Sequence, residues 1–96
     1  MKKYYVYILS NRRRTVYYTG VSNDFKRRFH EHKSGCGSQF CKKYNINELV
    51  YFEELTDINY AIMREKKIKK LSKVNKLKLI SKINPGNEDL SLKYKL

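Results

Sequence analysis

The sequence predicts an α+β fold, and two observations lead to it. Aromatic and β-branched residues concentrate in three short segments before residue 53, a composition typical of strands. From Asp57 onward the apolar residues recur at helical spacing instead. The chain has 96 residues, of which 41% are hydrophobic, so it holds enough apolar material for one core and too little length for two. We therefore expect a single domain over residues 1–96.

The first two strand-like segments predict a hairpin. Residues 4–9, Tyr-Tyr-Val-Tyr-Ile-Leu, form the first strand, and the polar, basic residues 10–14 form a short loop. Residues 15–19 form the return strand, which Gly20 is expected to end. Because side chains alternate along a strand, Tyr7 shares its face with every second residue and lies opposite its immediate neighbours.

A helix is predicted to follow the hairpin. It begins near Asp24, with Ser22 or Asn23 as its cap, and it ends in a glycine-rich segment. Two phenylalanines four residues apart form its buried stripe. Arg28 and His32 are also four residues apart, so they project together from an adjoining stripe.

The second half of the chain is predicted to be mostly helical. Residues 39–45 are irregular or a short helical turn, residues 49–52 are a third strand, and a break near Ser72 divides the helical region that follows. The apolar stripe of that region comprises Ile58, Ala61, Ile62, Ile68 and Leu71, and it continues through Val74, Leu77, Ile80 and Ile83. Glu65 stands inside this stripe. Asn-Pro-Gly-Asn ends the helix, and residues 85–96 are expected to form a loose C-terminal tail.

The charge points to a polyanionic partner. The chain carries 22 Lys and Arg against 9 Asp and Glu, a formal net charge of +13. A small folded domain with this balance repels itself, and its usual use is to bind phosphates. A solvated lysine-rich surface is the plain alternative. An anionic membrane surface is weaker, since it calls for a strongly amphipathic basic helix with bulky apolar anchors.

No targeting segment is evident. No apolar run approaches the roughly 18 residues of a membrane span. The first residues lack the apolar stretch and cleavage site of a signal peptide, so we expect a cytoplasmic protein. Cys36 and Cys41 are then expected to be reduced thiols. A zinc site is disfavoured, because His30 and His32 point about 200° apart around a helix.

Five residues form a set suited to phosphodiester hydrolysis: Tyr7, Tyr18, Arg28, His32 and Glu65. A carboxylate can hold a hard divalent cation, Mg²⁺ or Mn²⁺, which activates the phosphate. A guanidinium contacts two phosphate oxygens and neutralises charge in the transition state. A phenol or imidazole can accept a proton from water. Each residue has an ordinary alternative: core aromatics for the tyrosines, surface charge for Arg28 and Glu65, and a helix-end residue for His32.

The order of these residues resembles the GIY-YIG nucleases, in their small single-domain branch. The segments that carry the resemblance are Tyr5-Val6-Tyr7, Tyr18-Thr19-Gly20, residues 22–29 and 31–35, residues 49–54, 61–62 and 64–66, and residues 83–85 and 89–90. They cover nearly the whole chain in the family's order. The glycine of the first motif is Tyr5 here.

The resemblance implies a three-stranded antiparallel sheet flanked by helices and a role for each motif residue. Tyr7 would be the general base, and Tyr18 would support the nucleophile and the phosphate. Arg28 and His32 would complete the catalytic set, and Glu65 would bind the metal. The resemblance also implies substrate contacts for Gly20 and Asn84, with a structural role as the alternative for Asn84. The charge of Lys66, Lys69 and Lys70 indicates contact with a phosphate backbone, and a solvated surface is the alternative.

The sequence therefore predicts a metal-dependent endonuclease that hydrolyses DNA one strand per active site, in repair or processing. A nucleic-acid-binding module of the same fold without turnover is the alternative, and a subunit of a repair complex is a third. RNA as the substrate stays open. So does the oligomeric state, a monomer or a weak dimer.

Overall fold

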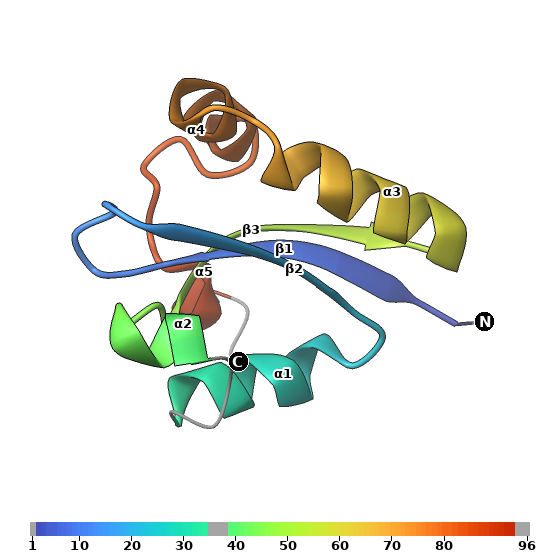
Figure 1. The fold of residues 1–96 in the computed structure, drawn as a ribbon, viewed down its shortest axis with the longest axis horizontal. Coiled ribbons are helices and arrows are strands. Elements are labelled where there is room, and N and C mark those ends of the chain that lie inside the picture. Colours follow the sequence, from blue (N-terminus) through green and yellow to red (C-terminus); the bar gives the residue numbers. More distant parts are fainter. Residues whose placement is uncertain (1, 35–38, 94–96) are drawn as a thin grey trace.

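The fold is a three-stranded antiparallel sheet with helices on both faces, as the sequence predicts (Figure 1). The computed structural model describes residues 2–34 and 39–93. The elements in chain order are β1 (Tyr4–Ser10), β2 (Tyr17–Ser22), α1 (Phe25–Lys33), α2 (Gln39–Lys43), β3 (Glu48–Leu55), α3 (Ile58–Lys69), α4 (Lys73–Ser81) and α5 (Leu90–Lys93). The strand order is β2-β1-β3, so β1 is central and β2 is an edge strand.

The sheet separates two hydrophobic layers. Helices α3 and α4 cover one face, and α1, α2 and α5 cover the other (Figure 1). Along β1, Tyr7 and Leu9 belong to the layer with α1, whereas Val6 and Ile8 belong to the layer with α3. The predicted alternation of the first strand is therefore confirmed. Because β1 has a neighbour on each side and helices above and below, its residues from Val6 onward are fully buried.

Gly20 does not end the second strand, contrary to the sequence-based expectation. It lies inside β2, where it pairs with Tyr7 of β1. A Cβ atom on Gly20 would lie 2.6 Å from both Cζ and Oη of Tyr7. A glycine within a strand often marks such a close approach. The residue therefore serves the packing of the Tyr7 ring.

The helices begin at side-chain caps. Asp24 rather than Ser22 or Asn23 caps α1, and its carboxylate accepts from the backbone N–H of Arg27. Ser72 caps α4 in the same way. The predicted break near Ser72 is thus confirmed as the start of a separate helix.

The apolar stripe of α3 and α4 is buried less than its spacing predicts. Ala61, Ile68 and Ile80 are buried, and Leu71 is partly buried. The other predicted members are exposed: Ile58, Ile62, Val74, Leu77 and Ile83. The two helices sit on one face of a narrow sheet, which can cover only the side of each helix that faces it. None of the described helices combines the length and apolar character of a bilayer crossing.

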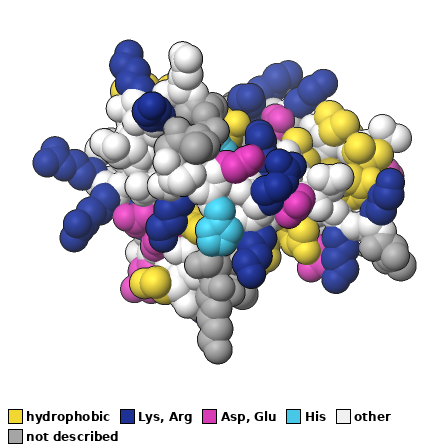
Figure 2. Space-filling model, turned by 90° about the horizontal axis from the view of Figure 1, so that it is seen from below, with side chains coloured by type: hydrophobic (Ala, Val, Ile, Leu, Met, Phe, Trp, Pro, Cys, Tyr) yellow, Lys and Arg dark blue, Asp and Glu magenta, His cyan; other side chains and the backbone are white. Residues whose placement is uncertain are grey.

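Basic side chains are distributed widely over the molecule. On the face that carries α1, Figure 2 shows lysine and arginine side chains spread over the middle of the face and much of its outline rather than in one patch. Together with the net charge of +13, this arrangement gives the surface a broadly positive potential.

Residues 84–93 are docked on the sheet and do not form the loose tail expected from residue 85. Leu90 and Ser91 are buried, and the Asp89 carboxylate accepts from the backbone N–H of Leu49 in β3 at 3.1 Å. The spacing of these few residues gave no helical signal, and polar contacts rather than a long apolar stripe hold them. Residues 94–96 lie outside the described residues.

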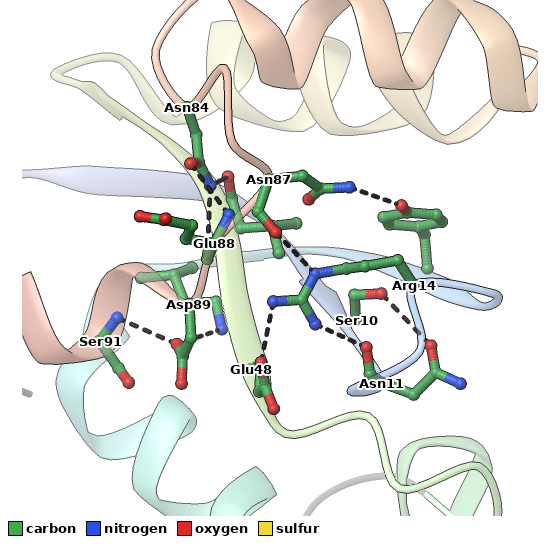
Figure 3. A network of polar contacts seen from close by, with 12 residues as sticks. Ser10, Asn11, Arg14, Glu48, Asn84, Asn87, Glu88, Asp89 and Ser91 are labelled. Atoms are coloured by element: carbon green, nitrogen blue, oxygen red, sulfur yellow. Dashed lines mark hydrogen bonds and ion pairs between the residues drawn. The ribbon is translucent and has the colours of Figure 1, made fainter.

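Asn84 anchors this segment (Figure 3). Its Nδ2 donates to the carbonyls of Val50 at 3.0 Å and Glu88 at 2.8 Å. Its Oδ1 accepts from the backbone N–H of Glu88 at 3.1 Å. The side chain is buried, so these bonds form where water cannot replace them.

Arg14 joins the same segment to the hairpin loop (Figure 3). Its Nε donates to the carbonyl of Asn87 at 2.9 Å, and its Nη2 lies 2.8 Å from Oε1 of Glu48. Asn87 also donates from Nδ2 to the hydroxyl of Tyr17 at 3.0 Å. The β1–β2 loop, β3 and the C-terminal segment are therefore tied together by one polar network.

We predict that Asn84→Ala lowers the free energy of unfolding by about 2–4 kcal/mol, because it removes the three hydrogen bonds of a buried side chain and leaves the buried carbonyl of Val50 without its partner. Urea unfolding followed by circular dichroism measures this change. Asn75→Ala, at an exposed position of α4, is the matched control and should stay within about 0.5 kcal/mol of the unmodified chain. Equal stability of both variants would contradict the anchoring role.

Candidate active site

Tyr7 lies at the centre of the α1 face of the sheet. Its side chain is 1% exposed, and its ring packs 5.0 Å from that of Phe25. The hydroxyl has no hydrogen-bond partner among the described residues. Burial, reinforced by Tyr18, raises the pKa of Tyr7 to about 12, although the nearby Arg28 opposes the shift. The hydroxyl is therefore protonated at neutral pH.

Tyr18 and His32 pack beside Tyr7. The His32 ring lies 5.4 Å from the Tyr18 ring and 6.5 Å from the Tyr7 ring, centroid to centroid. Both ring nitrogens of His32 are buried, and neither has a hydrogen-bond partner among the described residues. Burial and the neighbouring Arg28 lower the pKa of His32, with Glu31 opposing, so the imidazole is neutral at neutral pH.

Arg28 reaches the same group from α1. Its Nη1 lies 3.7 Å from Oε1 of Glu31, which is a loose ion pair, and the Arg28 side chain is 44% exposed. The guanidinium lowers the pKa of both Tyr7 and Tyr18 without outweighing burial. It therefore stands close to the two hydroxyls while keeping access to solvent.

Glu65 approaches from the opposite side of the sheet. It lies on α3, partly buried. Burial raises the pKa of Tyr18, and Cys41 and Glu65 raise it further, whereas the positive charge of Arg28 lowers it. Because β2 is an edge strand, groups from both faces can act on the same tyrosine. The predicted set of Tyr7, Tyr18, Arg28, His32 and Glu65 thus gathers at this edge.

The chemistry of Glu65 suits a hard divalent cation. Although Arg64 and Lys66 flank it in the sequence, its carboxylate makes no hydrogen bond or ion pair with any described residue. Among residues 2–34 and 39–93 no group of three or more His, Cys, Asp and Glu side chains could hold a metal. A cation at Glu65 would therefore take its other ligands from water and a substrate phosphate, as Mg²⁺ characteristically does.

The remaining candidate residues divide into two groups. Lys66, Lys69 and Lys70 are exposed on α3, and Lys66 and Lys70 line a groove of 480 Å³. Gly20 and Asn84 are occupied in the fold, by the Tyr7 ring and by the C-terminal segment respectively. Both N–H bonds of the Asn84 amide are donated within the fold, so this side chain offers no donor to a substrate.

The sequence analysis missed an ionic contact between α3 and β3. Arg64 makes a bidentate pair with Glu53, with Nε 3.0 Å from Oε1 and Nη2 2.8 Å from Oε2. The Tyr51 hydroxyl donates to the same carboxylate. These bonds lower the pKa of Glu53, although burial alone would raise it. A strand glutamate eleven residues before a helical arginine gives no local signal of pairing.

Of the two cysteines, Cys41 is among the described residues. Cys41 is buried and forms no disulfide among the described residues. Cys36 lies outside the described residues.

Comparison with known proteins identifies relatives over most of the chain. Residues 3–78 match the model of the GIY-YIG catalytic domain. A UPF0213 protein of Syntrophus aciditrophicus is 40% identical over 86 residues, which span 88% of this chain and 97% of that protein. A UPF0213 protein of Clostridium perfringens is 40% identical over 77 residues, 80% of this chain and 82% of that protein.

A solved structure is similar as well. The solution NMR structure of a UPF0213 protein from Bacillus halodurans superimposes with a TM-score of 0.59 at 29% sequence identity. The superposition covers 93% of this chain and 94% of the other. The superposition therefore extends beyond residues 3–78, which the family model matches.

The buried imidazole makes stability depend on pH. The pKa of His32 is lower in the folded chain than in the unfolded one, so the unfolded chain binds a proton more readily as the pH falls. We therefore predict that the free energy of unfolding decreases from about pH 7.5 to about pH 5.5. His32→Gln should flatten this dependence in urea titrations. His30→Gln, at an exposed position of the same helix, should keep it, and an unchanged slope in His32→Gln would contradict the assignment.

Proposed function

The chain belongs to the GIY-YIG catalytic domain family, and from that premise we propose that it is a metal-dependent endonuclease that hydrolyses DNA phosphodiester bonds, one strand per active site. The observation that carries the proposal is that the rings of Tyr7, Tyr18 and His32 pack together at the β2 edge, where the charges of Arg28 and Glu65 both act on the Tyr18 hydroxyl. The net charge of +13 supports a nucleic-acid substrate.

In the proposed mechanism Tyr7 accepts the proton of the attacking water. Its own hydroxyl is protonated at neutral pH, since burial raises its pKa to about 12. The Tyr7 oxygen can therefore accept a proton from water only if its own hydroxyl proton passes to another group at the same time. His32 is a suitable acceptor, because its lowered pKa keeps the ring neutral and both its nitrogens are unpartnered among the described residues. Tyr18, beside both rings, then orients the water and the phosphate by hydrogen bonds.

Arg28 binds and neutralises the phosphate in this mechanism. A guanidinium matches two phosphate oxygens at once, and negative charge accumulates on those oxygens in the transition state. The ion pair of Arg28 with Glu31 is long, at 3.7 Å, so a phosphate can replace it at small cost. Glu65 would hold the divalent cation, which supplies charge stabilisation at the phosphate when bound.

A second candidate is a nucleic-acid-binding module without turnover. The deep burial of Tyr7 favours it, since a hydroxyl that is shielded from solvent meets water only after the edge strand or α1 shifts. The two candidates share the charged surface and differ only in the chemistry at the β2 edge, so a cleavage assay separates them.

The proposal predicts cleavage of DNA with Mg²⁺ or Mn²⁺ and none with a chelator. Duplex, nicked, flapped and single-stranded DNA are compared with RNA on denaturing gels. Glu65→Gln keeps the size of the side chain and removes the charge that binds the cation, so cleavage should fall at least about 100-fold while DNA binding persists. Glu88→Gln, at an exposed position, should cleave normally. Full activity of Glu65→Gln would exclude the metal assignment, and no cleavage by the unmodified chain would favour the binding module.

Tyr7→Phe should separate activity from stability. The variant keeps the ring over Gly20 and removes a buried hydroxyl without a described partner, so the free energy of unfolding should be unchanged or higher. Turnover should fall by about 10²–10⁴-fold, the usual contribution of general base catalysis. Tyr4→Phe, on the same strand but in the layer with α3, is the control. Tyr17→Phe is less suitable, because its hydroxyl accepts from Asn87. Equal losses in Tyr7→Phe and Tyr4→Phe would indicate a packing role.

A further inference from the structure

A second pocket opens on the α1 face beside the candidate active site, at the end of the sheet where β1 begins. It encloses 560 Å³, within the range of roughly 300–1,000 Å³ found for small-molecule sites. Its lining consists of Tyr5, Asn23, Asp24, Phe25, Lys26, Phe52 and Glu54. None of these side chains has a part in the hydrolysis proposed above.

The floor of this pocket is aromatic. The rings of Phe25 and Phe52 lie 6.3 Å apart and nearly parallel, with an interplanar angle of 16°, and the Tyr5 ring lies 5.9 Å from that of Phe25. Hydrophobic side chains gather on this face toward the end of the molecule that carries the N-terminus (Figure 2). Tyr5 stands where the first motif of the family has glycine, so this chain adds a ring at the pocket.

The rim of the pocket is polar, and part of it is available to a ligand. Asp24 is engaged with Arg27, and Glu54 pairs with Lys3 at 3.0 Å. The Asn23 amide makes no hydrogen bond within the described part of the chain, and the Lys26 ammonium makes no ion pair there. An amide can bond two atoms on the edge of a base, and an ammonium can contact a phosphate.

The pocket adjoins the candidate site for hydrolysis. Asn23 lines the aromatic pocket and also lines a separate groove of 340 Å³, whose walls include Arg27 and Arg28. The short turn between β2 and α1 therefore has the aromatic pocket on one side and the phosphate-binding arginine on the other. A nucleotide bound across this turn would place its base in the pocket and its phosphate toward Arg28.

We propose that this pocket binds one unstacked nucleobase next to the phosphate that is cleaved, with the partly exposed Tyr5 ring as the stacking surface, Phe25 and Phe52 as the floor and Asn23 at the base edge. The proposal rests on the proposed function, because it names the substrate that the same site prefers. Aromatic rings bind the faces of bases with little regard to sequence. A base within a continuous duplex is paired and stacked on its neighbours, so it cannot enter. The substrate class is therefore DNA with an unpaired base, as in a bulge, flap or mismatch.

The test is a binding cycle with two proteins and two DNAs, measured with chelator so that no cleavage occurs. The DNAs are a duplex with one bulged adenine and the same duplex with an abasic residue at the bulge. Fluorescence anisotropy gives each affinity. The unmodified chain should bind the bulged adenine about 5- to 100-fold more tightly than the abasic bulge, the range expected for stacking of one base. Tyr5→Leu should remove most of this preference and leave the affinity for the abasic bulge unchanged.

Two variants control for the loss of a tyrosine. Tyr5→Phe retains the ring and should retain the preference. Tyr44→Leu makes the same substitution at an exposed tyrosine just after α2, outside the lining of the pocket, and should retain it too. Thermal unfolding verifies that each variant is folded. The comparison of the two DNAs with the unmodified chain needs no substitution, so it tests the pocket even if Tyr5→Leu is unstable.

The outcomes separate this pocket from the nuclease activity. Equal affinity of the unmodified chain for both DNAs, or an unchanged preference in folded Tyr5→Leu, would overturn the pocket while cleavage with Mg²⁺ could still stand. A preference that depends on Tyr5, in a chain that cleaves no DNA, would support base binding and overturn the proposed nuclease.

Discussion

The close approach of Tyr7 to Gly20 is the constraint on which the rest of the site depends. The two residues are paired across β1 and β2, and the ring occupies the space that any Cβ at Gly20 would need. This contact fixes the ring against the sheet and leaves its hydroxyl buried without a described partner. An unpartnered buried hydroxyl lowers stability, and such a cost is a common feature of functional sites. The fold therefore holds the Tyr7 hydroxyl in a position that packing alone would not favour.

The edge position of β2 explains how one site can draw on both layers. In a central strand the sheet itself would separate the helices above from those below. At the edge, Arg28 from α1 and Glu65 from α3 both influence the Tyr18 hydroxyl, with opposite signs. A cation and a carboxylate on opposite sides of a phenol are well arranged for a phosphate and its metal. The same edge position leaves the turn between β2 and α1 open to solvent, where the aromatic pocket begins.

The polar network around Asn84 and Arg14 completes the domain beyond the matched catalytic region, which ends at residue 78. Without this network, the backbone N–H of Leu49 in β3 would lose its bond to Asp89. Arg14 in the hairpin loop would lose its contacts with Asn87 and Glu48. A small domain buries too little apolar surface to tolerate such losses easily. The near-complete coverage of the Syntrophus aciditrophicus and Bacillus halodurans relatives agrees with a C-terminal segment that is part of the fold.

The amino-acid order alone predicted the three strands, the helix after the hairpin, the alternation of β1 and the helix break at Ser72. These features depend on local periodicity, on caps and on the order of motifs, all of which are written along the chain. Only the tertiary structure decided that Gly20 lies within a strand, that Asn84 is engaged in the fold and that residues 84–93 dock on β3. It also revealed the pairing of Arg64 with Glu53 and the aromatic pocket beside Tyr5. Each of these depends on contacts between segments distant in the chain, whose geometry the spacing of residues does not specify.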